Sequence, residues 1–144
     1  MHYLVYVSQA AQPFTEAALA DLLGYSRRRN TAEGITGLLI YRHDAGDGRG
    51  CFIQMVEGER DRIDAVWKRI AADKRHHTKI VLEEGQSSTR LFPDWSMGFR
   101  NVEAGEIERF EGYSDIGSPA FWQRAAAGKL AGALDLLRAF QDEA

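Results

Sequence analysis

The sequence predicts a single α+β domain built on a five-stranded sheet, in the order strand, helix, strand, strand, helix, strand, strand. Short β-branched and aromatic runs alternate with two stretches in which apolar residues recur at helical spacing. The chain has 144 residues, of which 44% are hydrophobic and 27% charged, as in an ordinary globular domain. Both helices are expected on one face of the sheet.

The first strand and the first helix follow from local sequence signals. Residues 3–7 form a short apolar run, which predicts a buried strand. Thr15 suits the N-cap of the following helix. That helix is expected to end near Asn30, because Gly34 lies just beyond it.

The middle of the chain predicts the rest of the sheet. Strands are expected at residues 35–41 and 51–56, joined by a hairpin loop at residues 42–50 whose glycines suit turns. A fourth strand is expected at residues 79–82 and a fifth around residues 95–99. Apolar residues at helical spacing predict the second helix, on the face made by Ile63, Val66, Trp67 and Ile70. This order resembles a ferredoxin-like arrangement.

The chain divides into a domain at residues 1–100 and a helical extension at residues 101–144. Ser118 and Pro119 have the residue types of a helix start. An apolar stripe follows at Leu130, Ala133, Leu134, Leu137 and Phe140. The C-terminal helices are expected to cover the second face of the sheet or to make a homodimer contact. Without them that face would expose Tyr3, Val5, Val7, Ile53 and Met55.

Charge and cysteine content limit the classes of function. The 18 basic and 21 acidic residues give a net charge of −3, which provides no overall field for attracting nucleic acid or an anionic membrane. The single Cys51 can form no intramolecular disulfide. No stretch approaches the roughly 20 apolar residues that a membrane span requires. We therefore expect a cytoplasmic protein without nucleic-acid or membrane partners.

Two polar side chains interrupt predicted strands on sides that should be buried. Gln54 lies within the apolar run at residues 51–56, and Tyr6 lies within the run at residues 3–7. A buried amide without a partner costs on the order of 1–3 kcal/mol, so Gln54 needs partners from protein, water or a ligand. In the simplest structural interpretation, the two side chains satisfy each other across neighbouring strands.

Five separated motifs resemble, in order and spacing, the BLUF family of blue-light sensors using FAD. They are Leu-Val-Tyr-Val-Ser at 4–8, Asn-Thr-Ala-Glu-Gly-Ile-Thr-Gly-Leu-Leu at 30–39, Phe-Ile-Gln-Met-Val-Glu-Gly at 52–58, Asp-Lys-Arg-His-His at 73–77 and Phe-Pro-Asp-Trp-Ser-Met at 92–97. The resemblance covers about residues 1–100. Any one motif alone would be weak, whereas their agreement is specific.

The resemblance implies a noncovalently bound FAD whose ring stands between the two helices. Asn30 and Gln54 would hydrogen-bond the polar edge of the ring, with Tyr6 behind Gln54. Leu22 and Ile70 would contact the ring faces, and nearby cations would suit the diphosphate. The residues that match cofactor-binding positions are Tyr6, Leu22, Ser26, Asn30, Gln54, Arg69, Ile70, Asp73, Arg75 and His76.

The resemblance also implies a photoreceptor and not an enzyme. Light would change the hydrogen bonds around the flavin through Tyr6 and Gln54. Trp95 and Met97 are expected on one side of the fifth strand. A rearrangement of Gln54 would shift this strand and so bias the position of the C-terminal helices behind it. The signal would pass to a separate effector protein, and a homo-oligomer is expected. The hairpin at residues 42–50 is longer than is usual in the family, which affects partner surfaces more than flavin binding.

Two other classes of function compete with a photoreceptor. Residues 49–53, Arg-Gly-Cys-Phe-Ile, faintly resemble an RNA-recognition motif, although the acidic net charge and the inward position of Gln54 oppose RNA binding. A ferredoxin-like small-molecule enzyme is also compatible with the fold. A flavoprotein would be yellow when purified, and an RNA-binding module would be colourless. No metal site is expected, because the twelfth residue of a calcium loop begun at Asp44 is Met55 and not Glu.

Overall fold

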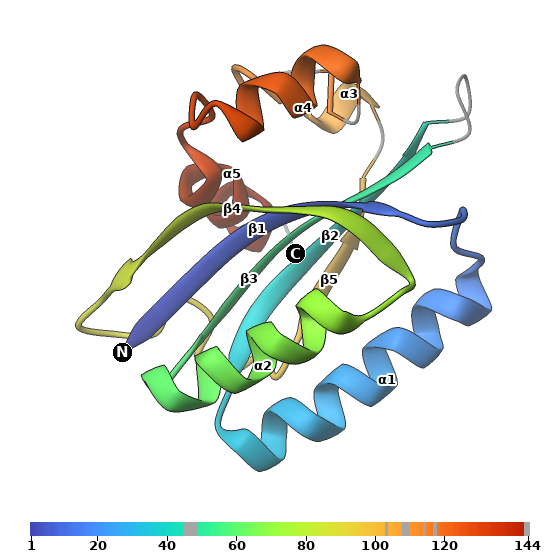
Figure 1. Ribbon diagram of the computed structural model, residues 1–144. Helices are drawn as coiled ribbons and strands as arrows, with labels where there is room; N and C mark the ends of the chain where they lie inside the picture. The colour runs from blue at the N-terminus through green and yellow to red at the C-terminus, as the bar shows by residue number, and fades with distance from the viewer. Residues whose placement is uncertain (45–48, 103, 108–109, 114, 117, 143–144) are drawn as a thin grey trace.

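The computed structural model contains one five-stranded sheet with helices on both faces (Figure 1). It describes residues 1–44, 49–102, 104–107, 110–113, 115–116 and 118–142. In this part of the chain, no helix has the length and apolar character to cross a bilayer. The elements in chain order are β1 (His2–Ala10), α1 (Glu16–Glu33), β2 (Thr36–Asp44), β3 (Arg49–Gly58), α2 (Arg60–Ala72), β4 (His76–Gln86), β5 (Gly98–Asn101), α3 (Ala104–Ile107), α4 (Pro119–Ala126) and α5 (Ala133–Asp142).

The sheet has the predicted five strands, in the spatial order β4-β1-β3-β2-β5. Neighbouring strands are antiparallel except β2 and β5, which run parallel. The register of β1 and β3 places Tyr6 directly opposite Gln54. Side chains at opposite positions of paired strands share one face, so the expected contact between these two residues is confirmed.

Helices cover both faces of the sheet. Helices α1 and α2 lie side by side over one face, and α5 lies against the other (Figure 1). The second face buries Val5, Ile53 and Met55 beneath side chains of the C-terminal helices, including Phe121, Leu136, Leu137 and Phe140. The expectation that these helices cover the second face is confirmed. Leu136, which is fully buried, was not part of the predicted stripe.

Caps at both ends fix the length of α1. The hydroxyl of Thr15 accepts a hydrogen bond from the backbone N–H of Ala18 at 3.1 Å. Gly34 ends the helix in the left-handed conformation, with a φ of 68°, and its N–H bonds the carbonyl of Asn30. The helix therefore runs to Glu33, somewhat beyond the predicted end near Asn30, and stops at Gly34, which adopts a positive φ.

Several strands are longer than the apolar pattern predicts. Strand β4 starts at His76 and pairs along most of β1, whereas the pattern indicated only residues 79–82. Strands β2 and β3 pair as far as Asp44 and Arg49, so part of the predicted loop at residues 42–50 is strand. Backbone pairing extends these strands into polar sequence, which the pattern of side chains does not reveal. Residues 45–48 of the predicted loop lie outside the described residues.

The predicted placement of Trp95 and Met97 on one side of a strand is wrong. Strand β5 begins only at Gly98, and the residues before it turn. Trp95 stacks on Phe92, with ring planes 9° apart, and packs against the cluster beneath the C-terminal helices. Met97 belongs to the cluster of Tyr6 on the other face. Alternation applies only to extended strand, so it fails for this bent segment.

Candidate functional site

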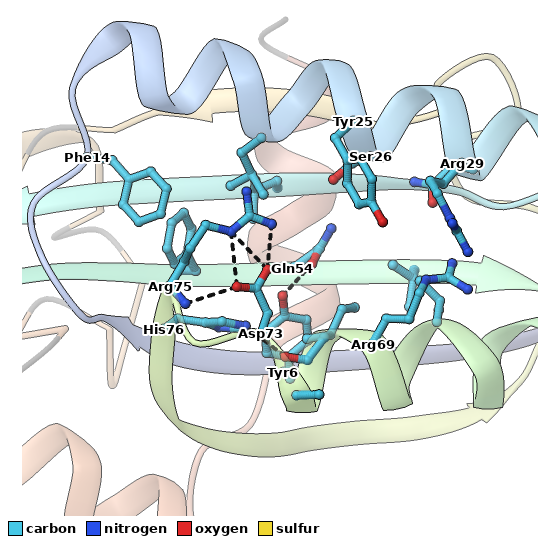
Figure 2. Close-up of a pocket in the computed structure, with 18 residues that line it drawn as sticks. Tyr6, Phe14, Tyr25, Ser26, Arg29, Gln54, Arg69, Asp73, Arg75 and His76 are labelled. Carbon is cyan, nitrogen blue, oxygen red and sulfur yellow. Dashed lines mark hydrogen bonds and ion pairs between the residues drawn. The ribbon is translucent and has the colours of Figure 1, made fainter.

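A cavity of about 610 Å³ lies between α1, α2 and the sheet (Figure 2). This volume is within the roughly 300–1,000 Å³ of ordinary small-molecule sites. Side chains of β1, β2 and β3 form its floor, and the two helices and the turn after α2 form its walls. The lining residues are Tyr6, Phe14, Leu22, Tyr25, Ser26, Arg29, Asn30, Leu39, Phe52, Gln54, Val56, Val66, Arg69, Ile70, Ala72, Asp73, Arg75 and His76.

A chain of hydrogen bonds lies at the floor of the cavity. The hydroxyl of Tyr6 donates to Oε1 of Gln54, and Nε2 of Gln54 donates to Sδ of Met97 at 3.3 Å. All three side chains are buried, and Gln54 is only 7% exposed. Among the described residues no acceptor meets the second N–H of the Gln54 amide, which leaves it for a group in the cavity.

The surroundings of Tyr6 keep its phenol protonated. Burial raises the pKa of Tyr6 above its ordinary value, and the negative charge of Asp73 adds to this effect. The ring of Trp67 lies 5.3 Å from the ring of Tyr6, measured between centroids. Tyr6 therefore acts as a hydrogen-bond donor to Gln54 in an apolar, aromatic environment.

Helix α1 brings a second amide to the cavity. Asn30 is 3% exposed, and its Nδ2 donates to the backbone carbonyl of Ser96 at 2.7 Å. Arg27 Nε donates to the backbone carbonyl of the following residue, Met97, at 2.9 Å. Both α1 and Gln54 thus hold the segment that precedes β5.

Three arginines line the cavity: Arg75 lies at one end of it, and Arg29 and Arg69 lie at the other (Figure 2). Arg69 pairs with Glu33 at 2.7 Å, and Arg75 pairs with Asp73 at 2.5 Å. Burial alone would raise the pKa of Asp73, but the hydrogen bonds and charge of Arg75 outweigh it and hold that pKa below its ordinary value. The arrangement suits a ligand with an anionic group, because guanidinium groups bind phosphate oxygens well.

His76 joins three elements beside the cavity. The Ser8 hydroxyl lies 2.6 Å from Nδ1 of His76, and Nε2 lies 2.9 Å from the carbonyl of Ile70. Burial lowers the pKa of His76 despite the opposing effect of the Ile70 carbonyl. A neutral ring that donates from Nε2 and accepts at Nδ1 fits both partners, and it ties the end of α2 to β1 and β4.

The structure gathers all ten residues that were predicted to bind a cofactor around this one cavity. Their roles toward a ligand stay a prediction. Neither Trp95 nor Met97 lines the cavity, although Met97 accepts a hydrogen bond from Gln54, which does. The sequence analysis missed Tyr25 and Arg29, which also line it. Their spacing from Leu22 and Ser26 on one helix face is the signal that could have found them.

Comparison with known proteins identifies the family. The model of the BLUF family, described as sensors of blue-light using FAD, matches residues 1–98. Photoactivated adenylate cyclase subunit alpha of Euglena gracilis is 32% identical over 102 residues, which are 69% of this chain and 9% of that protein. The beta subunit is 30% identical over 95 residues, which are 65% of this chain and 10% of that protein. The match thus spans about a tenth of these relatives.

Solved structures agree with this match. BlrB, a BLUF protein in its dark state, has 29% identity and a TM-score of 0.66, covering 90% of this chain and 96% of that one. BlsA in its photo-activated state has 27% identity and a TM-score of 0.65, covering 83% and 81%. The matched family is one of blue-light sensors. With the fold, the cavity and the family match in agreement, the chain belongs to the BLUF family of flavin-dependent blue-light sensors.

Proposed function

We propose that this chain binds FAD noncovalently in the cavity between α1 and α2 and senses blue light by rearranging the amide of Gln54. The buried chain from Tyr6 through Gln54 to Met97, directly beneath the cavity, carries this proposal. The family match favours it over an RNA-binding module or a small-molecule enzyme.

The residues present fit a flavin. Leu22 and Ile70, on the two helices, offer apolar contacts to a flat ring between them. The remaining N–H groups of Asn30 and Gln54 suit the carbonyl and ring-nitrogen acceptors at its polar edge. Ser26 lines the same helix wall and adds a hydroxyl.

The arginines favour a flavin that carries phosphate over riboflavin. Arg69 and Arg75 supply positive charge beside the cavity, with Asp73 and His76 orienting the turn that carries Arg75. A diphosphate gains from these cations, whereas riboflavin has no charge there to bind them. FMN has been observed in a related fold, that of BlrP1 from Klebsiella pneumoniae, so the identity of the flavin needs a direct test.

The response to light rests on the two ends of the Gln54 amide. The bound flavin supplies a strong oxidant when it absorbs blue light. Tyr6 is the electron and proton donor closest to Gln54 in this arrangement, and its hydroxyl is already aligned with Oε1. Tyr6 would give one electron and one proton to the excited flavin and later regain both, so neither group would be oxidised or reduced overall. The Gln54 amide would keep a changed orientation or tautomer. The hydrogen bonds from this amide to the ring edge and to Sδ of Met97 would then differ from those in the dark.

The output is proposed to pass from residues 1–100 to the C-terminal extension, residues 101–144, and on to a separate effector protein. Met97 contacts Gln54 on the flavin side, and Trp95 packs against the cluster of the C-terminal helices. The Euglena gracilis relatives are photoactivated adenylate cyclase subunits, so in those proteins light acts on a cyclase. A homo-oligomer in the cytoplasm would fit this role.

The flavin content of the purified protein tests the proposal. The protein should be yellow, and heat or acid should release FAD that chromatography separates from FMN and riboflavin. Release of FMN alone would overturn the assignment of FAD. A colourless preparation that cannot be reconstituted with any flavin would overturn flavin binding altogether.

A further inference from the structure

Glu57 on β3 is a buried carboxylate on the face of the sheet opposite to the cavity. Glu57 is 1% exposed. Ile53 and Met55, whose side chains lie on the same face of β3 as that of Glu57, belong to the cluster of the C-terminal helices. Burying a charged group is costly unless hydrogen bonds compensate it. The hydrogen-bond partners of the Glu57 carboxylate therefore indicate which part of the chain it positions.

Two of those partners belong to the segment that leads into β5, and the third begins β2. The backbone N–H groups of Leu91 and Phe92 each donate to the Glu57 carboxylate at 2.7 Å. The hydroxyl of Thr36 donates to the same carboxylate at 2.8 Å. Arg90, which immediately precedes Leu91, donates to the Thr36 hydroxyl and to the carbonyl of Gly34. One side chain of the sheet thus anchors the start of the segment at residues 91–97.

The far end of the same segment meets the cavity residues. Asn30 donates to the carbonyl of Ser96, and Gln54 donates to Sδ of Met97. In between, Trp95 stacks on Phe92, with centroids 5.8 Å apart. The segment 91–97 therefore crosses from the cluster of the C-terminal helices to the cluster of Tyr6, held by Glu57 at one end and by the two cavity amides at the other.

We propose that Glu57 is a positioning residue for the light response. By holding one end of segment 91–97, it sets how readily this segment moves when the Gln54 amide changes its hydrogen bond to Met97. This inference rests on the proposed function. Glu57 touches no residue of the cavity floor through its carboxylate, so it acts through the segment alone. With one end fixed, a change at Met97 meets resistance, and that resistance contributes to the barrier for return to the dark state. A loosened segment should return faster.

The test compares Glu57→Gln and Thr36→Val with a matched control, Glu83→Gln. The first variant replaces one carboxylate acceptor by an amide group that opposes a backbone N–H. The second removes the hydroxyl that donates to the carboxylate and accepts from Arg90. Glu83 accepts a hydrogen bond from the Tyr3 hydroxyl and has no hydrogen bond to the segment. Flavin content, the light-induced absorption shift, its dark recovery rate and amide hydrogen exchange are measured on the full chain.

Glu57→Gln should keep the flavin while its dark recovery becomes about tenfold faster, as expected for loss of a charge-assisted hydrogen bond. Thr36→Val should change recovery in the same direction by about threefold, and it serves as the test if Glu57→Gln does not fold. Hydrogen exchange of residues 91–97 should rise in both variants, and Glu83→Gln should behave as wild type. Recovery within about twofold of wild type in the folded variants, despite faster exchange, would overturn the inference. A wild-type protein without a flavin shift would instead contradict the proposed function.

Discussion

Tyr6 and Gln54 stand opposite each other on neighbouring strands, and the Tyr6 hydroxyl donates to the Gln54 side-chain carbonyl. The register of β1 and β3 alone brings them together, so no loop has to move to form the pair. Since the amide also donates to Met97, a change in its orientation alters hydrogen bonds on both sides at once.

Removing the Tyr6 hydroxyl should abolish the light response without removing the flavin. Tyr6→Phe keeps the ring that packs against Trp67 but loses the donor to Gln54. Absorption spectra before and after blue light should show bound flavin and no normal red shift. Tyr41→Phe is the matched control, because Tyr41 is buried on the same face and its hydroxyl accepts from the N–H of Phe14. A Tyr6→Phe protein that photocycles like wild type would disprove this role.

Gln54→Ala should likewise retain flavin and lose the shift, because it removes both the acceptor for Tyr6 and the donor to Met97. The same spectra test this variant. An unchanged shift in Gln54→Ala would mean that the light-induced change lies elsewhere in the site.

Asn30→Ala should weaken flavin binding while preserving much of the fold. The variant loses one amide facing the cavity together with the hydrogen bond to the Ser96 carbonyl. Leaving a buried partner of this amide unsatisfied costs about 1–3 kcal/mol, so the Kd for FAD should rise about 5- to 150-fold in fluorescence titrations. Asn101→Ala, at an exposed position of β5, should leave the Kd unchanged. Equal affinities for wild type and Asn30→Ala would remove Asn30 from the site.

Arg75→Ala should lower affinity for FAD more than affinity for riboflavin. The Arg75 side chain is 45% exposed, so solvent screens its charge and the loss for FAD should be about three- to tenfold. Arg60→Ala is the control, because Arg60 is 68% exposed and its ion pair with Asp64 is long, at 4.0 Å. Equal losses for FAD and riboflavin would show that Arg75 does not contact the diphosphate.

Protonation of His76 should destabilise the protein in mild acid. Burial lowers the pKa of His76 below the ordinary 6.5, so the unfolded chain binds this proton more readily than the folded one. The contribution of His76 to stability is therefore present above about pH 6.5 and is lost as the pH falls through the folded-state value. Urea unfolding across this range measures it. His76→Gln should flatten the dependence, and His77→Gln, at an exposed site, should not.

The sequence predicted the elements and their order because short apolar runs mark the strands, Thr15 and Gly34 mark the ends of α1, and helical spacing of apolar residues marks α2. It also predicted the Tyr6–Gln54 contact, since two polar interruptions of buried strands need partners. Strand ends were less accurate, because β4 and the β2–β3 hairpin are extended by backbone pairing and not by apolar side chains.

Trp95 and Met97 show where pattern reasoning fails. Their spacing of two residues implied that both side chains lie on one face. Instead, the Trp95 ring packs against the backbone of Gly98, where a Cβ would lie 2.3 Å from a ring carbon. Such a close approach is possible only for glycine, and it depends on contacts distant in sequence. The anchoring of this segment by Glu57 was likewise invisible before the fold was known.

The reversible absorption shift of the wild-type protein tests the central claim most directly. Spectra are recorded in darkness, after blue light, and during recovery in darkness. The account predicts an oxidised flavin whose absorption moves to longer wavelength in the light and returns fully, with the flavin unreduced at each stage. A bound flavin whose spectrum does not move, or that is bleached by reduction, would contradict it.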